Sequence, residues 1–264
     1  MGKAKFPHTW GLGIWILGIG GSLTACGSTA PAPTLHIAAA ASLQPVLEAL
    51  DPLYQAQHPG LTLTYSFGAS GTLQQQISQG APVDGFIAAA PEPIDRLAQQ
   101  GRVVPGSQRD LATNQLVVVT PQGQPPLADF RDLAQPTLGR IALGEPRTVP
   151  LGQYSQEVLQ NLGIWEEIQP KVVWMPQGRS VLAAVETGNV DAAIVYRSDA
   201  LGSAQVTLGA VADPSLHRPI RYVFALIQAP DRPPPDPNPA ATYGAFLQSP
   251  PAQALFRDYG FGNL

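Results

Sequence analysis

Two serines stand where a strand-like segment runs into a helix-like one. Ser42 follows the alanine run 39–41, and Ser70 lies in the glycine-lined turn 68–71. A serine at such a junction either caps the helix, which is worth about 1 kcal/mol, or offers its hydroxyl to a ligand beside the free N–H groups of the first helical turn. Ser42 taken alone is better explained as an N-cap. Gly68 and Gly71 beside Ser70 would let backbone amides approach a ligand closely.

Nucleophilic chemistry is the alternative use of these hydroxyls. Residues 68–72 partly imitate a nucleophile elbow, but Thr72 replaces the final glycine. The histidines at 36, 58 and 217 lie in a strand, before a proline and in a proline-flanked loop, and neither serine has a lysine three residues on. No His, Cys or carboxylate cluster has metal-ligand spacing. We therefore expect no enzyme, no cofactor and no directly coordinated metal, with a lipid-anchored serine hydrolase as the alternative from another class.

Composition excludes a polyanion-binding protein. The 264 residues are 44% apolar and 13% charged, with a formal charge of −4 and no run of Lys or Arg. A nucleic-acid partner requires a basic stripe, so none is expected. An anion must instead be held by local geometry.

The N-terminus reads as an export signal. Lys3 and Lys5 precede the apolar run 10–23, which has the length of a signal-peptide core. The following residues 23–27, Leu-Thr-Ala-Cys-Gly, resemble the lipobox of bacterial lipoproteins. We expect a signal peptide over 1–25, lipidation of Cys26, a flexible tether over 26–33 and a periplasmic or extracytoplasmic, membrane-anchored protein. Cys26 is the only cysteine, so no disulfide within the chain is possible.

Strand-like and helix-like segments alternate along the rest of the chain, as in α/β proteins with mixed, mostly parallel sheets covered by helices on both faces. The expected strands are 35–40, 61–66, 83–88, 116–120, 140–143, 172–174, 192–196 and 222–228. The expected helices are 43–57, 73–79, 91–100, 153–162, 180–186, 240–248 and 252–259, with a proline-rich turn over 230–239. Ligands of such sheets bind at the carboxyl ends of the strands, which is where the serines lie.

Several motifs resemble the periplasmic molybdate-binding family. They are AASL (40–43), FGASGTL (67–73), GAPVDGFIAA (80–89), GEPRTVPLGQY (144–154), NVDAAIVYRSDA (189–200) and FRDYGF (256–261). The resemblance covers nearly all of 35–264 in order. Two departures are Ala88-Ala89-Ala90-Pro91, where the family usually has a polar Ser-Ala-Asp, and a glycine at 178, where a larger apolar residue is more common.

The resemblance implies a five-residue oxyanion site. Ser42 and Ser70 donate hydroxyl and backbone hydrogens, Tyr196 donates its phenol, and Leu151 and Gly178 donate backbone N–H groups. The implied ligand is molybdate or tungstate, bound as the oxyanion, with sulfate or phosphate as alternatives. Direct contact of Arg147 or Arg179 with the anion is a further alternative, although a rim position is more typical of arginine.

The implied fold is the two-lobed type II periplasmic-binding architecture. We place lobe one at 34–113 plus 221–264 and lobe two at 114–220, with crossings near 112–115 and 217–222. The implied role is that of a monomeric solute-binding protein that delivers its cargo to a transmembrane permease subunit and its ATPase.

Overall fold

A computed structural model describes residues 33–228 and 238–263. The expected signal peptide over 1–25, the lipidation of Cys26 and the tether up to residue 32 lie outside the described residues, as does most of the proline-rich turn 230–239. No helix among the described residues is both long and apolar enough to span a bilayer.

The first sheet has the strand order β2-β1-β3-β10-β4. Its strands are β1 (Thr34–Ala40), β2 (Thr62–Gly68), β3 (Gly85–Ala88), β4 (Arg109–Thr113) and β10 (Arg221–Leu226). The second sheet has the order β7-β6-β8-β5-β9. Its strands are β5 (Leu116–Pro121), β6 (Ile141–Gly144), β7 (Val172–Met175), β8 (Ala192–Tyr196) and β9 (Val206–Val211). Each sheet with its helices forms one lobe.

Both sheets are mixed, as expected, but parallel pairs are not in the majority. In the first sheet β1 pairs in parallel with β2 and β3, while β10 is antiparallel to β3 and β4. The second sheet repeats this arrangement around β6 and β5. Every one of the antiparallel pairs contains β5 or β10, the two strands that directly follow the crossings between sheets. The short strands β4 and β9 were not predicted, since both carry polar or small residues.

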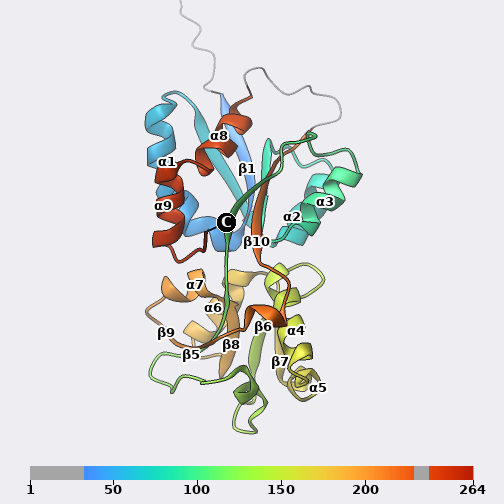
Figure 1. The fold of residues 1–264 in the computed structure, drawn as a ribbon, viewed down its shortest axis with the longest axis vertical. Helices are drawn as coiled ribbons and strands as arrows, with labels where there is room; N and C mark the ends of the chain where they lie inside the picture. The colour runs from blue at the N-terminus through green and yellow to red at the C-terminus, as the bar shows by residue number, and fades with distance from the viewer. Residues whose placement is uncertain (1–32, 229–237, 264) are drawn as a thin grey trace, which may run out of the picture. The chain divides into compact units, whose positions relative to one another are not determined.

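Helices cover both faces of the first sheet (Figure 1). They are α1 (Gln44–Gln57), α8 (Pro239–Leu247) and α9 (Pro250–Asp258) on one side, and α2 (Ser70–Ser78) and α3 (Glu92–Gln99) on the other. Successive side chains of a strand point to opposite faces of the sheet, so each face has its own core against its own helices. Ile37 and Ala39 join the core that contains α1, whereas Ala38 joins the smaller core that contains α2 and α3.

The second lobe carries α4 (Pro150–Asn161), α5 (Trp165–Ile168), α6 (Gly178–Glu186) and α7 (Arg197–Leu201). Short 3-10 turns complete the chain: η1 (Ala41–Leu43), η2 (Phe130–Ala134), η3 (Gln169–Lys171) and η4 (Pro214–Leu216). The helices α2, α4 and α6 begin two or three residues earlier than expected. Their first turns contain Gly or Pro, which are tolerated there because first-turn N–H groups need no partner within the helix.

The chain passes between the lobes twice. It leaves the first sheet through residues 114–115, between β4 and β5, and returns through 212–220, between β9 and β10. The strands of each sheet lie within the lobe segments given above, 34–113 with 221–264 and 114–220. The boundaries themselves remain predictions.

Candidate functional site

A small cavity lies where the carboxyl ends of strands from both sheets meet. The first lobe contributes Ala40, Ala41, Ser42, Gly68, Ala69, Ser70 and Ala89, and the second contributes Val149, Pro150, Leu151, Gly178 and Tyr196. All five residues that the sequence singled out, Ser42, Ser70, Leu151, Gly178 and Tyr196, therefore line one cavity.

Strand register brings the junctions together. In the first sheet Ala40 pairs with Gly68 at the last position of β1 and β2, so the segments that follow, with Ser42 and Ser70, start side by side. In the second sheet Gly144 pairs with Met175 at the ends of β6 and β7. The turns that lead into α4 and α6 therefore leave the same edge of their sheet.

Ser42 is not the N-cap that its sequence position suggested. It lies inside η1, whose N-cap is Ala40, and no side chain caps that turn. The Ser42 Oγ instead forms a 2.9 Å hydrogen bond with the phenol oxygen of Tyr222. The competing cap role is absent because the chain tightens into a 3-10 turn before α1 begins.

Ser70 is the first residue of α2, and its side chain does not cap the helix. Its Oγ accepts a hydrogen bond from the backbone N–H of Ala89 at 3.0 Å, and the residue is 1% exposed. A hydroxyl that already accepts one bond keeps its own hydrogen to donate. The Ala89 amide, in the segment that departs from the family pattern, thus supports Ser70 as a donor. No local pattern of residues indicated this contact.

Three helices present their N-termini to the cavity. The first residue of α4 is Pro150, which has no N–H, so the amide of Leu151 is the first that this helix offers. The first residue of α6 is Gly178, and that of α2 is Ser70. Helix N-termini carry partial positive charge and free N–H groups, so this end of each lobe favours an anion.

Tyr196 contributes the least satisfied polar group of the cavity. It ends β8, is 2% exposed, and its phenol oxygen has no hydrogen-bond partner among the described residues. Burial above all holds the pKa of Tyr196 well above its ordinary value, so the phenol stays protonated as a donor. A buried polar group without a partner costs about 1–3 kcal/mol, which a ligand acceptor in the cavity can recover.

The described lining contains no charged side chain. Arg147 is exposed and pairs with Glu145, with 3.0 Å between its Nε and the Glu145 Oε1. Arg179 is exposed as well, and neither arginine lines the cavity. Nor do the described histidines, and no group of three or more His, Cys, Asp or Glu side chains suited to a metal ion occurs in the part of the chain that is described.

Asp199, which the sequence analysis did not single out, is a buried carboxyl close to the site. It lies in α7, three residues after Tyr196, and is 4% exposed with no partner for its Oδ2 among the described residues. Burial raises the pKa of Asp199 to about 7, against the opposing effect of the Arg179 charge. The carboxyl is therefore largely neutral in mildly acidic solution.

The lobes touch each other beside the cavity. The backbone N–H of Gly71 in α2 donates to the carbonyl of Thr148, in the second lobe, at 3.0 Å. A Cβ on Gly71 would lie 2.7 Å from that carbonyl oxygen. Glycine at position 71 therefore permits the close approach of one lobe to the other.

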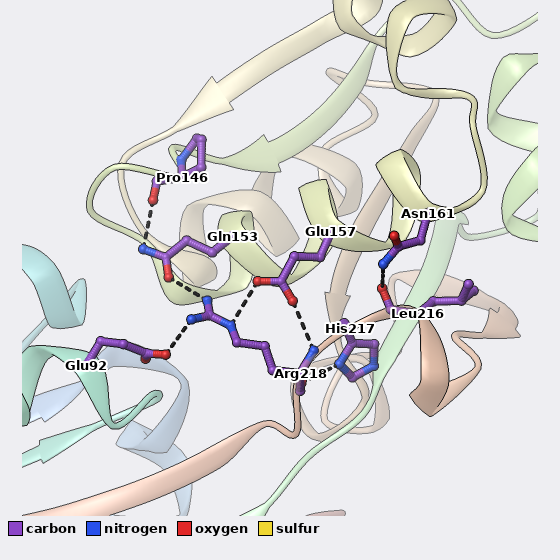
Figure 2. Close-up of polar contacts among 8 residues, drawn as sticks. All are labelled: Glu92, Pro146, Gln153, Glu157, Asn161, Leu216, His217 and Arg218. Carbon is purple, nitrogen blue, oxygen red and sulfur yellow. Dashed lines mark hydrogen bonds and ion pairs between the residues drawn. The ribbon is translucent and has the colours of Figure 1, made fainter.

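A second contact between lobes centres on Arg218, in the return crossing (Figure 2). Its guanidinium forms an ion pair with Glu92 at the start of α3, and on the other side binds Glu157 at 2.8 Å and Gln153 at 3.0 Å, both in α4. The backbone N–H of Arg218 also donates to Glu157 at 3.0 Å. With three bonds to α4, Arg218 belongs with the second lobe, so its pairing with Glu92 links the two lobes.

The cavity suits a compact ligand. Its volume is about 20 Å³. Pockets for larger organic ligands measure roughly 300–1,000 Å³. The size and the neutral donors together match a small anion of a few heavy atoms.

Two α/β lobes joined by two crossings, with a donor-lined cavity between them, define a binding protein of the type II periplasmic class. Solved structures of this class share the fold. A periplasmic molybdate-binding protein of Azotobacter vinelandii superimposes with a TM-score of 0.77 at 24% identity, covering 87% of this chain and 99% of that chain. The substrate-binding domain of a provisionally assigned molybdenum ABC transporter from Clostridium difficile gives 0.68 at 33% identity, covering 88% of this chain and 99% of that one.

Sequence comparison gives the family. The profile of the bacterial extracellular solute-binding proteins matches residues 35–262, and this chain belongs to that family. A Bacillus subtilis protein, YvgL, provisionally named an ABC transporter substrate-binding lipoprotein, is 38% identical over 86% of each chain. The molybdate-binding protein ModA of Escherichia coli is 32% identical over 86% of this chain and 88% of its own length.

Proposed function

We propose that this protein captures molybdate or tungstate outside the cytoplasm and delivers it to an ABC importer. The observation that carries the proposal is a cavity in which two serine hydroxyls, a buried phenol without a partner among the described residues, and three helix N-termini converge, with no charged side chain in its described lining. Ser42, Ser70 and Tyr196 bind through their hydroxyls, and Leu151 and Gly178 through their backbone N–H groups.

The chemistry of the lining favours a fully deprotonated tetrahedral anion. Such an oxyanion has only acceptors, and the cavity supplies N–H and O–H donors. Phosphate carries a proton near neutral pH and needs an acceptor for it, so it suits this site less well. Partial charges at the three helix N-termini balance the anion without a salt bridge.

The relatives support molybdate or tungstate over sulfate. ModA of Escherichia coli and of Haemophilus influenzae are molybdate-binding proteins that align with 86% and 89% of this chain. A sulfate-binding protein from Mycobacterium tuberculosis has the same fold at only 19% identity, a similarity that bears on the fold and not on the cargo.

The proposed setting is the outer face of a membrane. Lipidation of Cys26 tethers the chain there, and a ligand that touches both lobes favours the lobe-lobe contacts at Thr148 and Arg218 through its differential affinity for the closed state. A permease subunit with its ATPase then receives the closed, loaded monomer. No catalytic step is part of this role.

Thermal unfolding of the purified protein, alone and with molybdate, tungstate, sulfate or phosphate in excess, tests the proposal. A ligand at about 1,000 times its dissociation constant adds roughly 4 kcal/mol to the free energy of unfolding. We expect stabilisation by molybdate and tungstate. Stabilisation by sulfate or phosphate alone would change the cargo. No response to any anion, with labelling of Ser70 by a serine-directed phosphonate, would favour the hydrolase.

The substitution Tyr196→Phe makes a second test with effects of opposite sign. It removes a buried hydroxyl that has no hydrogen-bond partner in the part of the chain that the structure describes, so the melting temperature without ligand should stay the same or rise. The affinity for molybdate should fall about tenfold or more, because a hydrogen bond to a charged group is lost. Calorimetric titration and melting scans measure both. An unchanged dissociation constant would remove Tyr196 from the site.

A further inference from the structure

Among the described residues, Ser42 has the one cavity hydroxyl that is bonded to another side-chain hydroxyl, and that bond leads to the crossings between the lobes. Tyr222, in β10 just after the return crossing, is fully buried and bonds Ser42 at 2.9 Å. The same phenol oxygen accepts a hydrogen bond from the Nδ2 of Asn114, which lies in the first crossing, at 3.3 Å. The Asn114 Nδ2 also donates to the Ser198 Oγ of α7 at 2.8 Å.

The direction of each hydrogen bond in this chain follows from its ends. The Oδ1 of Asn114 accepts from the backbone N–H of Gln115 at 2.9 Å, so the amide nitrogen must face Ser198 and Tyr222. An amide nitrogen is only a donor, so the Tyr222 oxygen accepts from it. The phenolic proton then has one described partner left, the Oγ of Ser42. Burial keeps the pKa of Tyr222 above its ordinary value, so that proton is present.

We propose that Asn114 and Tyr222 are positioning residues that fix Ser42 as a hydrogen-bond donor to the bound anion. This inference rests on the proposed function. With its oxygen accepting from Tyr222, Ser42 turns its own hydrogen toward the cavity. Without this relay, the hydrogen bonds that run from Asn114 through Tyr222 to Ser42, the Ser42 hydroxyl is free to rotate. It can then point a lone pair at the anion, and the two repel each other. The relay also ties the orientation of a ligand donor to both crossings.

A double-mutant cycle on molybdate affinity tests whether Tyr222 acts through Ser42. We expect Tyr222→Phe to raise the dissociation constant about tenfold in the native background. In a Ser42→Ala background the same change should alter it less than twofold, because the hydroxyl that the relay orients is gone. A structural role of Tyr222 would give equal effects in both backgrounds.

Tyr243→Phe is the matched control. Tyr243 is also fully buried and shares a 2.8 Å hydroxyl-hydroxyl hydrogen bond, with Tyr65, in the same lobe but outside the cavity lining. Its effect on molybdate affinity should be less than twofold. Asn114→Ala, which removes the head of the relay, serves as the second variant if Tyr222→Phe does not fold, and its effect should also vanish in the Ser42→Ala background.

The outcomes separate the relay from the proposed function. If the native protein binds molybdate or tungstate but Tyr222→Phe binds as tightly, or loses the same affinity with and without Ser42, the relay is wrong and the function stands. If the native protein binds neither anion, both are overturned. Coupling of Tyr222 to Ser42 with a silent Tyr243→Phe establishes the relay.

Discussion

Gly71→Ala should separate closure of the lobes from stability of the fold. The added Cβ would lie 2.7 Å from the Thr148 carbonyl oxygen and 2.9 Å from its Cα, both backbone atoms of the other lobe. Ordinary contact requires the lobes to separate by roughly 0.8 Å, since van der Waals contacts of this kind optimise near 3.5 Å. That separation also lengthens the 3.0 Å hydrogen bond from Gly71 to Thr148.

The closed state should lose about 2 kcal/mol, the sum of a typical overpacking cost and a weakened hydrogen bond. Because binding is coupled to closure, the dissociation constant for molybdate should rise roughly thirtyfold. Alanine is the better helix former by about 1 kcal/mol, so the ligand-free first lobe should not be destabilised. Affinity and ligand-free stability are thus expected to move independently.

Isothermal titration with molybdate and melting scans without ligand measure the two effects. Gly202→Ala is the control, since a Cβ there meets the Asp199 carbonyl at an ordinary 3.5 Å within one lobe. The reasoning about closure would be refuted by a Gly71→Ala protein that binds molybdate with native affinity, or by one whose weaker binding is explained by a lower ligand-free melting temperature.

Three further predictions concern charge and anchoring. Between about pH 4 and 7, Asp199 is protonated in the folded protein and ionised in the unfolded chain. The free energy of unfolding should therefore fall by up to about 1.4 kcal/mol per pH unit as pH rises through that window. Asp199→Asn should flatten this slope in pH-dependent melting scans. Glu92→Gln breaks the ion pair with Arg218 between the lobes and should raise the dissociation constant for molybdate two- to fivefold. Asp110→Asn, which breaks an ion pair of similar exposure inside one lobe, should leave that constant unchanged. Titration of both variants with molybdate measures the difference. Cys26→Ser should move the protein from the membrane to the soluble fraction and abolish labelling by fatty acid; retention in the membrane would argue against the lipid anchor.

Local pattern was enough for most of the fold. Short apolar segments between turns predicted eight of the strands, and the five residues implied by the family resemblance, Ser42, Ser70, Leu151, Gly178 and Tyr196, all line one cavity. The starts of α2, α4 and α6 were placed too late, because the glycine and proline of their first turns were taken as helix breakers, although first-turn N–H groups need no partner within the helix. The strands β4 and β9 were not predicted, since their apolar pattern is weak. Both are strands because they pair with β10 and β5.

The role assigned to Ser42 shows the limit of that reasoning. Its position before a helix suggested a cap, yet its actual partner, Tyr222, lies 180 residues away. The pairing of Glu92 with Arg218 spans 126 residues, and Gly71 meets Thr148 across the gap between lobes. None of these contacts can be predicted from the spacing of nearby residues.

The sequence by itself determined which chemical groups stand at these strand-to-helix junctions: serine and tyrosine hydroxyls and first-turn amides. Only the tertiary structure decided what each group can do there. A hydroxyl donates or accepts according to the partner that it already has, and those partners arrive from distant segments through strand register and the two crossings. Donor type is a local property of the chain, whereas donor direction is a property of the assembled fold.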